Sequence, residues 1–356
     1  MSRIDTFLEL LVKQDGSDLH MVSGNPPRIR LHGELVAVKY RELSAAETMG
    51  LVSEIMPDAA RAAFEQRSSI DFAYAIDNLA RFRVNVYRHV NGVGAVLRVI
   101  PTTIKSMEEL GLPSVLANFC QQKKGLILCT GPTGSGKSTS LAALIDHVNS
   151  TRKGHILTIE DPIEFVHRNK MSLVSQREVG FDTRSFADAL HSAMREDPNV
   201  ILVGEMLDLE TISLAVTAAE TGILVLGTLH TNGAAATVDR IVNVFPPGDQ
   251  GRIRSMLSTS LLGVVSQQLV RRSDGKGRVA ALEILVNNPA VANILRDGKT
   301  EQIATAIQSG SLQGMQSMDT ALKRLLDAKQ IIGKDAYRKA IDKKLFEMYA
   351  EPDLAA

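Results

Sequence analysis

The sequence predicts an α/β protein of two domains, in which a smaller α+β domain precedes a larger domain of alternating strands and helices. Three observations support this fold class. The chain has 356 residues, a length typical of two domains. Strands are grouped together in the first hundred residues, whereas they alternate with helices from residue 125 onward. A glycine-rich loop joins the first of the later strands to the helix that follows it.

The first domain is expected to span residues 1–101. Apolar residues at helical spacing indicate a helix at residues 4–12, and the capping-box pattern Ser44-Ala-Ala-Glu47 starts another that runs to about Gln66. The remaining elements are a short strand at 16–21, a hairpin within 28–38 that turns at His32-Gly33, and strands at 69–76, 79–89 and 93–100.

Pro101 ends this domain, and residues 102–124 are expected to form a linker that continues into a helix. The second domain then spans residues 125–356. Its strands are predicted at 126–130, 156–160, 200–204, 223–228 and 279–285, and its helices at 137–149, 184–195, 208–221 and 233–244.

After Pro246-Pro247 the chain is expected to be mainly helical, which gives this domain a helical C-terminal extension. Two terminal helices are predicted at 317–329 and 333–349. A core-facing stripe of one earlier helix is expected to contain Ile253, Met256, Leu257, Leu261, Val264 and Val265.

The glycine-rich loop reads G-x-x-x-x-G-K-S, the pattern of a phosphate-binding loop. Glycines let the main chain curl tightly around phosphate oxygens, and the N-terminus of the following helix faces the same point. Lys137 supplies a positive charge for the β- and γ-phosphates, and the Ser138 hydroxyl is placed to bind Mg²⁺. The residues expected to contact the nucleotide are Gly131, Pro132, Thr133, Gly134, Ser135, Gly136, Lys137, Ser138 and Thr139.

Polar residues follow the other predicted strands at the edge where this loop lies. Glu205 ends a run of four apolar residues, which makes it the candidate general base; its alternative role is to cap the next helix. Glu160 and Asp161 are expected to reach Mg²⁺ through its waters, or else to belong to a turn before a proline. His230 is expected to contact the γ-phosphate, or else to be a buried structural residue.

Two arginines share one face of the strand predicted at 79–89. Arg81 and Arg83 alternate with apolar residues, so both point away from the core. Adjacent like charges on one face repel each other unless an anion lies near them, although a face exposed to solvent also accommodates them.

Composition excludes several classes of protein. Lys and Arg number 40, and so do Asp and Glu, so the chain lacks the bulk positive charge of many nucleic-acid motors. The two cysteines, Cys120 and Cys129, have no zinc-ligand spacing. No apolar run is long enough to span a membrane, and the first residues do not resemble a signal peptide. We therefore expect a cytoplasmic protein that does not act on nucleic acid.

Four motifs in order resemble those of the secretion ATPase superfamily: Gly131–Thr139, Thr158–Phe165, Val203-Gly-Glu205 and Leu229-His-Thr-Asn232. They correspond to Walker A, an Asp box, an atypical Walker B and a His box. Within this superfamily, further matches are typical of the pilus retraction ATPases: Gly16–His20, Pro26–Arg30, Arg81–Asn85 and Arg98–Pro101. The four-cysteine zinc motif common in the extension and secretion branches is missing.

The resemblance implies a PAS-like N-terminal domain, a RecA-like ATPase domain and a ring-shaped homohexamer. It further implies that ATP lies between the two domains, with Arg81, Arg83 and Arg98 closing onto its phosphates, and that Arg195 senses the nucleotide. The implied function is an ATP-hydrolysing motor for type IV pilus retraction, and hence twitching motility. The motor would act on an inner-membrane platform protein, at the inner membrane beneath the pilus.

Two residues depart from the pattern of the retraction ATPases. Leu207 stands where an arginine follows the catalytic glutamate, and Ala292 replaces the first arginine of a helix required for retraction. These departures leave an alternative open, in which the chain is a low-activity paralogue that regulates an active retraction ATPase.

Overall fold

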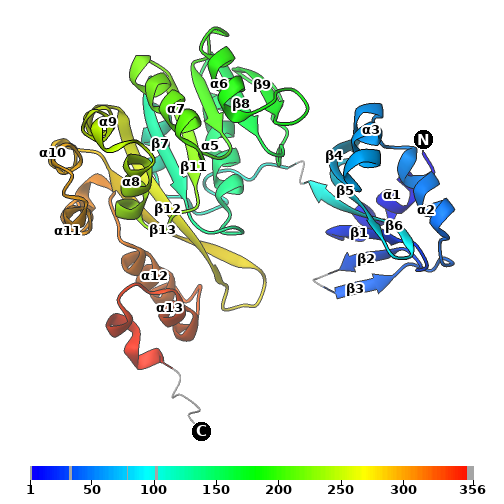
Figure 1. The fold of residues 1–356 in the computed structure, drawn as a ribbon. Helices are drawn as coiled ribbons and strands as arrows, with labels where there is room; N and C mark the ends of the chain where they lie inside the picture. Colours follow the sequence, from blue (N-terminus) through cyan, green and yellow to red (C-terminus); the bar gives the residue numbers. More distant parts are fainter. Residues whose placement is uncertain (1, 32–33, 78, 101–102, 351–356) are drawn as a thin grey trace. The chain divides into compact units, whose positions relative to one another are not determined.

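The computed structural model describes residues 2–31, 34–77, 79–100 and 103–350. Within it the chain forms two compact units, Met1–Thr103 and Ile104–Ala356, shown in blue and in green to red in Figure 1. His32 and Gly33, where the hairpin was expected to turn, and Pro101, the expected domain end, lie outside the described residues.

The first unit is built on a six-stranded antiparallel sheet in the order β3-β2-β1-β6-β5-β4. Helix α1 (Asp5–Lys13) and two later helices cover it, and Leu8, Phe64 and Phe82 lie in the core between them. The strands are β1 (Asp18–Val22), β2 (Arg28–Leu31), β3 (Glu34–Ala37), β4 (Ser69–Ile76), β5 (Ala80–His89) and β6 (Gly92–Ile100).

The capping box is confirmed, but the helix that it starts is shorter than expected. The Ser44 hydroxyl accepts from the Glu47 backbone N–H, and the Glu47 carboxylate accepts from that of Ser44. Helix α2 (Ala45–Ser53) then ends, and α3 (Asp58–Arg67) begins after Pro57. Proline lacks a backbone N–H and disfavours a helical residue before it, so a single helix to Gln66 was a wrong prediction.

The second unit contains a seven-stranded sheet in the order β13-β12-β7-β11-β10-β8-β9. All its neighbouring strands are parallel except β12 and β13. The strands are β7 (Gly125–Thr130), β8 (His155–Glu160), β9 (Leu173–Glu178), β10 (Val200–Val203), β11 (Leu224–Leu229), β12 (Leu261–Arg271) and β13 (Arg278–Val286).

Helices cover both faces of this sheet (Figure 1). Helices α4 (Val115–Cys120) and α5 (Lys137–Thr151) pack on one face. The opposite face is covered by α6 (Phe186–Ala193), α7 (Leu209–Thr221), α8 (Ala234–Asn243) and α9 (Pro247–Ser260). Side chains of the central strands are buried on both faces, as expected of a parallel sheet between two helical layers.

The segment after α9 differs from the prediction. Helix α9 ends at Ser260, and Leu261, Val264 and Val265 lie in β12 rather than on a helix. Because β12 is buried on both faces, its apolar residues do not alternate, and their spacing matched that of a helix. Strand β9 was also missed, since it is an edge strand of mixed polarity.

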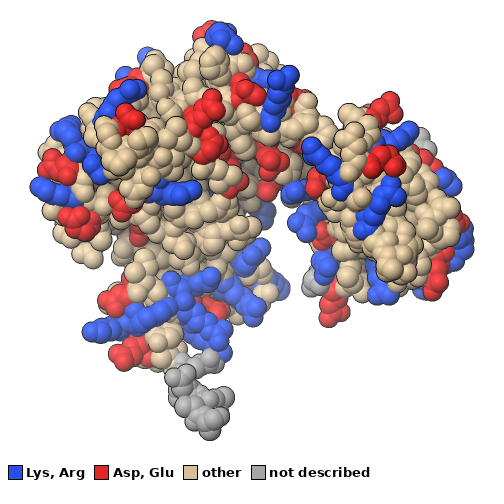
Figure 2. Space-filling view, in the orientation of Figure 1, with Lys and Arg blue, Asp and Glu red and all other residues tan. Residues whose placement is uncertain are grey.

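The remaining residues form the helical C-terminal part that the sequence predicts. It contains α10 (Pro289–Asp297), η1 (Thr300–Gln302), α11 (Ile303–Ser309), η2 (Ser311–Gln313), α12 (Met318–Asp327), α13 (Gly333–Lys339) and η3 (Lys343–Tyr349). A single terminal helix at 333–349 was wrong, because α13 ends at Lys339. Although the chain has no net charge, Lys and Arg gather over α12 and α13 on the face shown in Figure 2. Among the described helices, none has the length and apolar character required to cross a bilayer.

Candidate nucleotide site

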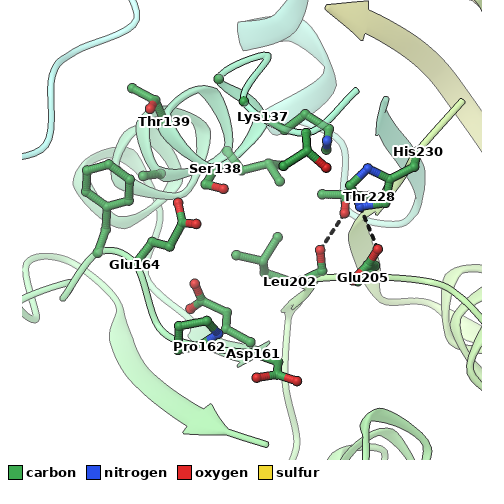
Figure 3. Close-up of a pocket in the computed structure, with 18 of the residues that line it drawn as sticks. Lys137, Ser138, Thr139, Asp161, Pro162, Glu164, Leu202, Glu205, Thr228 and His230 are labelled. Atoms are coloured by element: carbon green, nitrogen blue, oxygen red, sulfur yellow. Dashed lines mark hydrogen bonds and ion pairs between the residues drawn. The ribbon is translucent and has the colours of Figure 1, made fainter. Parts of the chain in front are cut away.

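A pocket of about 470 Å³ lies where the parallel strands β7, β8, β10 and β11 end (Figure 3). Open α/β sheets bind ligands at this edge. Each of the four strands delivers residues to the pocket. The loop after β7 contributes Lys137 and Ser138, the segment after β8 contributes Asp161, and the turns after β10 and β11 contribute Glu205 and His230. The structure therefore brings together the catalytic and metal residues predicted in this domain.

The phosphate loop joins the buried strand β7 to the start of α5. Gly131, Gly134 and Gly136 have φ values of 142°, 75° and 86°, which side-chain-bearing residues rarely adopt. Of the nine residues expected to contact the nucleotide, Thr133, Gly134, Gly136, Lys137, Ser138 and Thr139 line the pocket.

The Lys137 ammonium is directed at the phosphate loop itself. It donates to the carbonyl oxygens of Gly131 and Pro132 at 2.8 and 3.1 Å. Burial lowers the pKa of Lys137, and the negative charge of Glu205 opposes that effect. The pocket thus places a partly desolvated cation beside the loop, where a phosphate would strengthen its charged form.

Glu205 and His230 contact each other directly. The His230 Nε2 lies 2.6 Å from Glu205 Oε1, and the two side chains face each other in Figure 3. The structure contradicts both alternative roles, a helix cap for Glu205 and a buried structural residue for His230. Helix α7 is capped by Asp208, whose carboxylate accepts from the Thr211 N–H, and the His230 side chain is 41% exposed. The strand-end pattern predicted that both lie here, but not that they touch.

Three carboxylates form the opposite wall of the pocket. Glu160 is held by its neighbours, since it accepts from Thr158 Oγ1 at 2.7 Å and from Gln176 Nε2 at 3.2 Å. Burial raises the pKa of Glu160, and these hydrogen bonds oppose the shift. Asp161 and Glu164 also line the pocket, and Glu164 extends toward the side where Ser138 lies (Figure 3).

These oxygens fit Mg²⁺ better than a metal bound only by protein. No cluster of three metal-binding side chains occurs among the residues that the structure describes. Mg²⁺ in phosphate sites typically keeps several waters and takes few protein ligands. Ser138 and the carboxylates on the facing wall match that pattern, and Glu164 was not among the predicted metal residues.

Further lining residues that were not predicted as site residues include Phe165, His167, Phe186, Leu269 and Arg278. Leu269 lies on β12, a segment that was taken for a helix, and Arg278 lies at the start of β13, a strand that the sequence predicted at 279–285. His167 is almost completely buried, which lowers its pKa to about 4. Phe165 ends the Thr158–Phe165 motif, but no motif marks the other four positions, since their place depends on how the chain folds back over the sheet.

The predicted arginines of the first unit share one face of its sheet. Arg83 and Arg98 are direct cross-strand partners on β5 and β6, and Arg81 lies two residues before Arg83. Arg83 forms an ion pair with Asp71 at 3.5 Å, and Arg98 pairs with Asp18 at 2.7 Å. The like charges are thus partly balanced by aspartates within the unit.

Arg195 does not line the pocket. It is an exposed residue that follows α6. The two departures from the family pattern also lie outside the pocket: Leu207 is 53% exposed, and Ala292 is half-buried on α10.

Comparisons with known proteins agree with this site. Residues 1–324 match the family described as type II/IV secretion system protein. The chain is 53% identical over 314 residues to a twitching motility protein of Neisseria gonorrhoeae, covering 88% of this chain and 84% of the relative. It is 50% identical over 335 residues to the type IV pilus retraction ATPase PilT of Pseudomonas aeruginosa, covering 94% and 97%.

The type IV pilus ATPase PilU of Pseudomonas aeruginosa is 41% identical over 332 residues, covering 93% of this chain and 87% of the relative. Among solved structures, that of the pilus retraction motor PilT with bound ADP superimposes with a TM-score of 0.91 at 42% identity. It covers 98% of this chain and 99% of the other.

The predicted fold class, a PAS-like α+β domain followed by a RecA-like ATPase domain with a helical extension, is confirmed. The chain uses nucleotide, in keeping with its family and with this match. It therefore belongs to the type II/IV secretion system protein family, and within that family it is an ATPase that powers type IV pilus retraction.

Proposed function

We propose that the pocket at the ends of β7, β8, β10 and β11 is where this motor binds and hydrolyses ATP. Backbone N–H groups of the phosphate loop and the start of α5 hold the phosphates, and Lys137 turns its ammonium from the loop carbonyls to the β- and γ-phosphates. Ser138, with Glu160, Asp161 and Glu164 acting through waters, would hold Mg²⁺, which would supply positive charge beside the phosphates.

The contact of Glu205 with His230 carries this proposal. A carboxylate at the end of β10 orients the attacking water and accepts its proton, while His230 fixes the carboxylate and faces the γ-phosphate. In this arrangement the histidine reports whether the γ-phosphate is present. The 2.6 Å contact would therefore couple Glu205, which orients the water, to His230, which detects the phosphate.

We propose that the first unit supplies the second half of the site. Arg81, Arg83 and Arg98 present guanidinium groups from one sheet face, and we propose that they close onto the phosphates during turnover. Arg195, which lies outside the pocket, would then sense the nucleotide at a subunit boundary. We place the working domains at residues 1–101 and 125–356, joined by residues 102–124.

The motor is proposed to be a homohexamer in which closure at each site moves one unit against another. It would act on an inner-membrane pilus platform protein, from the cytoplasmic side of the membrane at the pilus base. The similarity to a retraction motor supports this assignment.

Replacing Glu205→Gln tests the role of the base. Because glutamine cannot accept the proton of water, we expect kcat to fall at least a hundredfold, while the Kd for ATP changes less than about threefold. Steady-state hydrolysis and binding of a fluorescent ATP analogue measure the two quantities. Turnover within threefold of the wild type would refute this role for Glu205.

The alternative, a low-activity accessory paralogue, rests on Leu207 and Ala292. Neither residue lines the pocket, and identity is higher to PilT than to PilU, so the main function is favoured. ATP hydrolysis by the pure protein distinguishes the two functions. A retraction motor should hydrolyse ATP alone, whereas an accessory paralogue would do so only when mixed with an active retraction ATPase.

A further inference from the structure

Strand β12 lies directly beside the phosphate loop, and Gln267 is its point of contact. The Gln267 side chain is buried, at 4% exposure. Its Nε2 donates to the backbone carbonyl of Ser135 at 2.7 Å, and its Oε1 accepts from Ser140 Oγ at 2.8 Å. One amide thus connects the middle of the loop to the first turns of α5.

The loop glycines fit tightly against the same residue. A Cβ at Gly131 would lie 2.3 Å from the backbone oxygen of Gln267, and a Cβ at Gly136 would lie 2.8 Å from its Nε2. In real proteins a Cβ essentially never lies within 3.0 Å of a heavy atom from a residue that is not its chain neighbour. Gln267 therefore contacts both ends of the loop as well as its middle.

The neighbouring residue of β12 holds the opposite side of the site. Ser266 Oγ accepts from the Gly233 N–H at 2.9 Å, in the turn that follows His230. Its cross-strand partner Glu283 accepts from the Ala234 N–H at 2.8 Å. Since successive strand residues point to opposite faces, β12 fixes the phosphate loop with one residue and the His230 turn with the next.

We propose that Gln267 is a positioning residue that holds the phosphate loop in its phosphate-binding conformation. This inference rests on the proposed nucleotide site. Gln267 does not line the pocket, so it acts through the loop and not on the nucleotide. If the loop adopts the binding conformation only part of the time, the apparent affinity for nucleotide falls by that fraction. Bound nucleotide restores the ordered loop. Loss of Gln267 therefore affects binding more than turnover at saturating ATP.

The test compares Gln267→Met with Gln268→Ala. Methionine keeps the length and volume of the side chain but removes both hydrogen bonds. Gln268 is the next residue along β12, does not line the pocket and serves as the matched control. For Gln267→Met we expect the KM for ATP and the Kd for ADP to rise about tenfold or more, with kcat within threefold of the wild type. For Gln268→Ala both constants should stay within twofold.

Ser140→Ala removes one of the two hydrogen bonds at a helix position that favours alanine, so it should fold even if Gln267→Met does not. It should raise the Kd for ADP about threefold. Ser266→Ala acts on the opposite face and should leave the Kd for ADP within twofold.

Lys137→Ala separates failure of this inference from failure of the proposed site. If Lys137→Ala loses ADP binding but Gln267→Met and Ser140→Ala bind ADP as tightly as Gln268→Ala, the positioning role is refuted and the site stands. If kcat falls in the same proportion as KM rises in Gln267→Met, the effect is not one of loop positioning, and the inference is also overturned. Wild-type affinity in Lys137→Ala would refute the site and the inference together.

Discussion

At the scale of single residues, Gly131 shows how closely the site is fitted. Its φ of 142° and its contact with β12 exclude any side chain. The sequence motif predicted a glycine for the approach of phosphate, but the structure adds a second constraint from the protein side. Residue 131 must therefore be glycine for two reasons, the approach of phosphate on one side and the contact with β12 on the other.

Gly131→Ala should lower the affinity for ADP at least tenfold, because the new methyl group forces the loop away from Gln267. The matched control is Gly248→Ala on α9, where the added Cβ has no atom within 4 Å apart from its chain neighbours and the backbone of its own helix. That variant should bind ADP normally, since alanine is favoured in a helix. Binding titrations check both, and equal affinity of the two variants would contradict the tight fit.

The sequence predicted which residues gather at the site, but not how they contact one another. Strand ends placed Glu205 and His230 at one edge, because parallel strands share that edge. Their 2.6 Å contact depends on side-chain rotamers and on the turns after β10 and β11, which residue spacing does not encode. Glu164 lies within the Thr158–Phe165 motif, but residue spacing did not predict its place in the wall of the pocket.

At the scale of elements, the segment after β8 forms one wall of the pocket and buries His167. Burial lowers its pKa to about 4, against 6.5 in an unfolded chain; the charge of Asp146 opposes this shift, and the charge of Lys170 adds to it. The unfolded state therefore binds a proton between pH 6.5 and about 4, whereas the folded state does not. Stability supplied by neutral His167 is present above pH 6.5 and is lost as the pH falls toward 4, by roughly 3 kcal/mol.

His167→Gln should flatten this dependence, because glutamine does not titrate. We expect the unfolding midpoint of the variant to fall less between pH 7 and pH 4.5 than that of the wild type. Replacing the exposed His191→Gln should leave the wild-type slope unchanged. Parallel slopes in thermal unfolding of the wild type and His167→Gln would show that His167 is not the responsible group.

Strand boundaries were predicted within a residue both for the half-polar strand β5 and for the fully buried strands β7, β10 and β11, but not for β12. Strand β5 alternates cleanly and was predicted within a residue, because one face carries arginines and the other packs on the core. Strand β12 is buried on both faces and was taken for a helix. That error concealed Gln267, since its role follows only from the position of β12 beside β7.

At the scale of the whole molecule, the proposed mechanism needs groups from both units. Arg83 is 46% exposed, and its ion pair with Asp71 is a weak surface contact. Arg83→Ala should lower kcat at least tenfold with little change in the unfolding midpoint, because the lost charge acts on the phosphates and not on the fold.

Asp71→Ala is the matched control, since it breaks the same ion pair but keeps the arginine. It should retain turnover within about twofold. If both variants lose activity equally in steady-state assays, the ion pair itself matters and the phosphate role of Arg83 is wrong.

The central claim is that hydrolysis at Glu205 drives pilus retraction. The most direct measurement counts surface pili and scores twitching in a deletion strain that expresses either the wild-type chain or Glu205→Gln. We predict that the deletion strain and the Glu205→Gln strain carry excess pili and do not twitch, and that the wild-type chain restores both properties. Cells without pili, or normal twitching with Glu205→Gln, would contradict the claim.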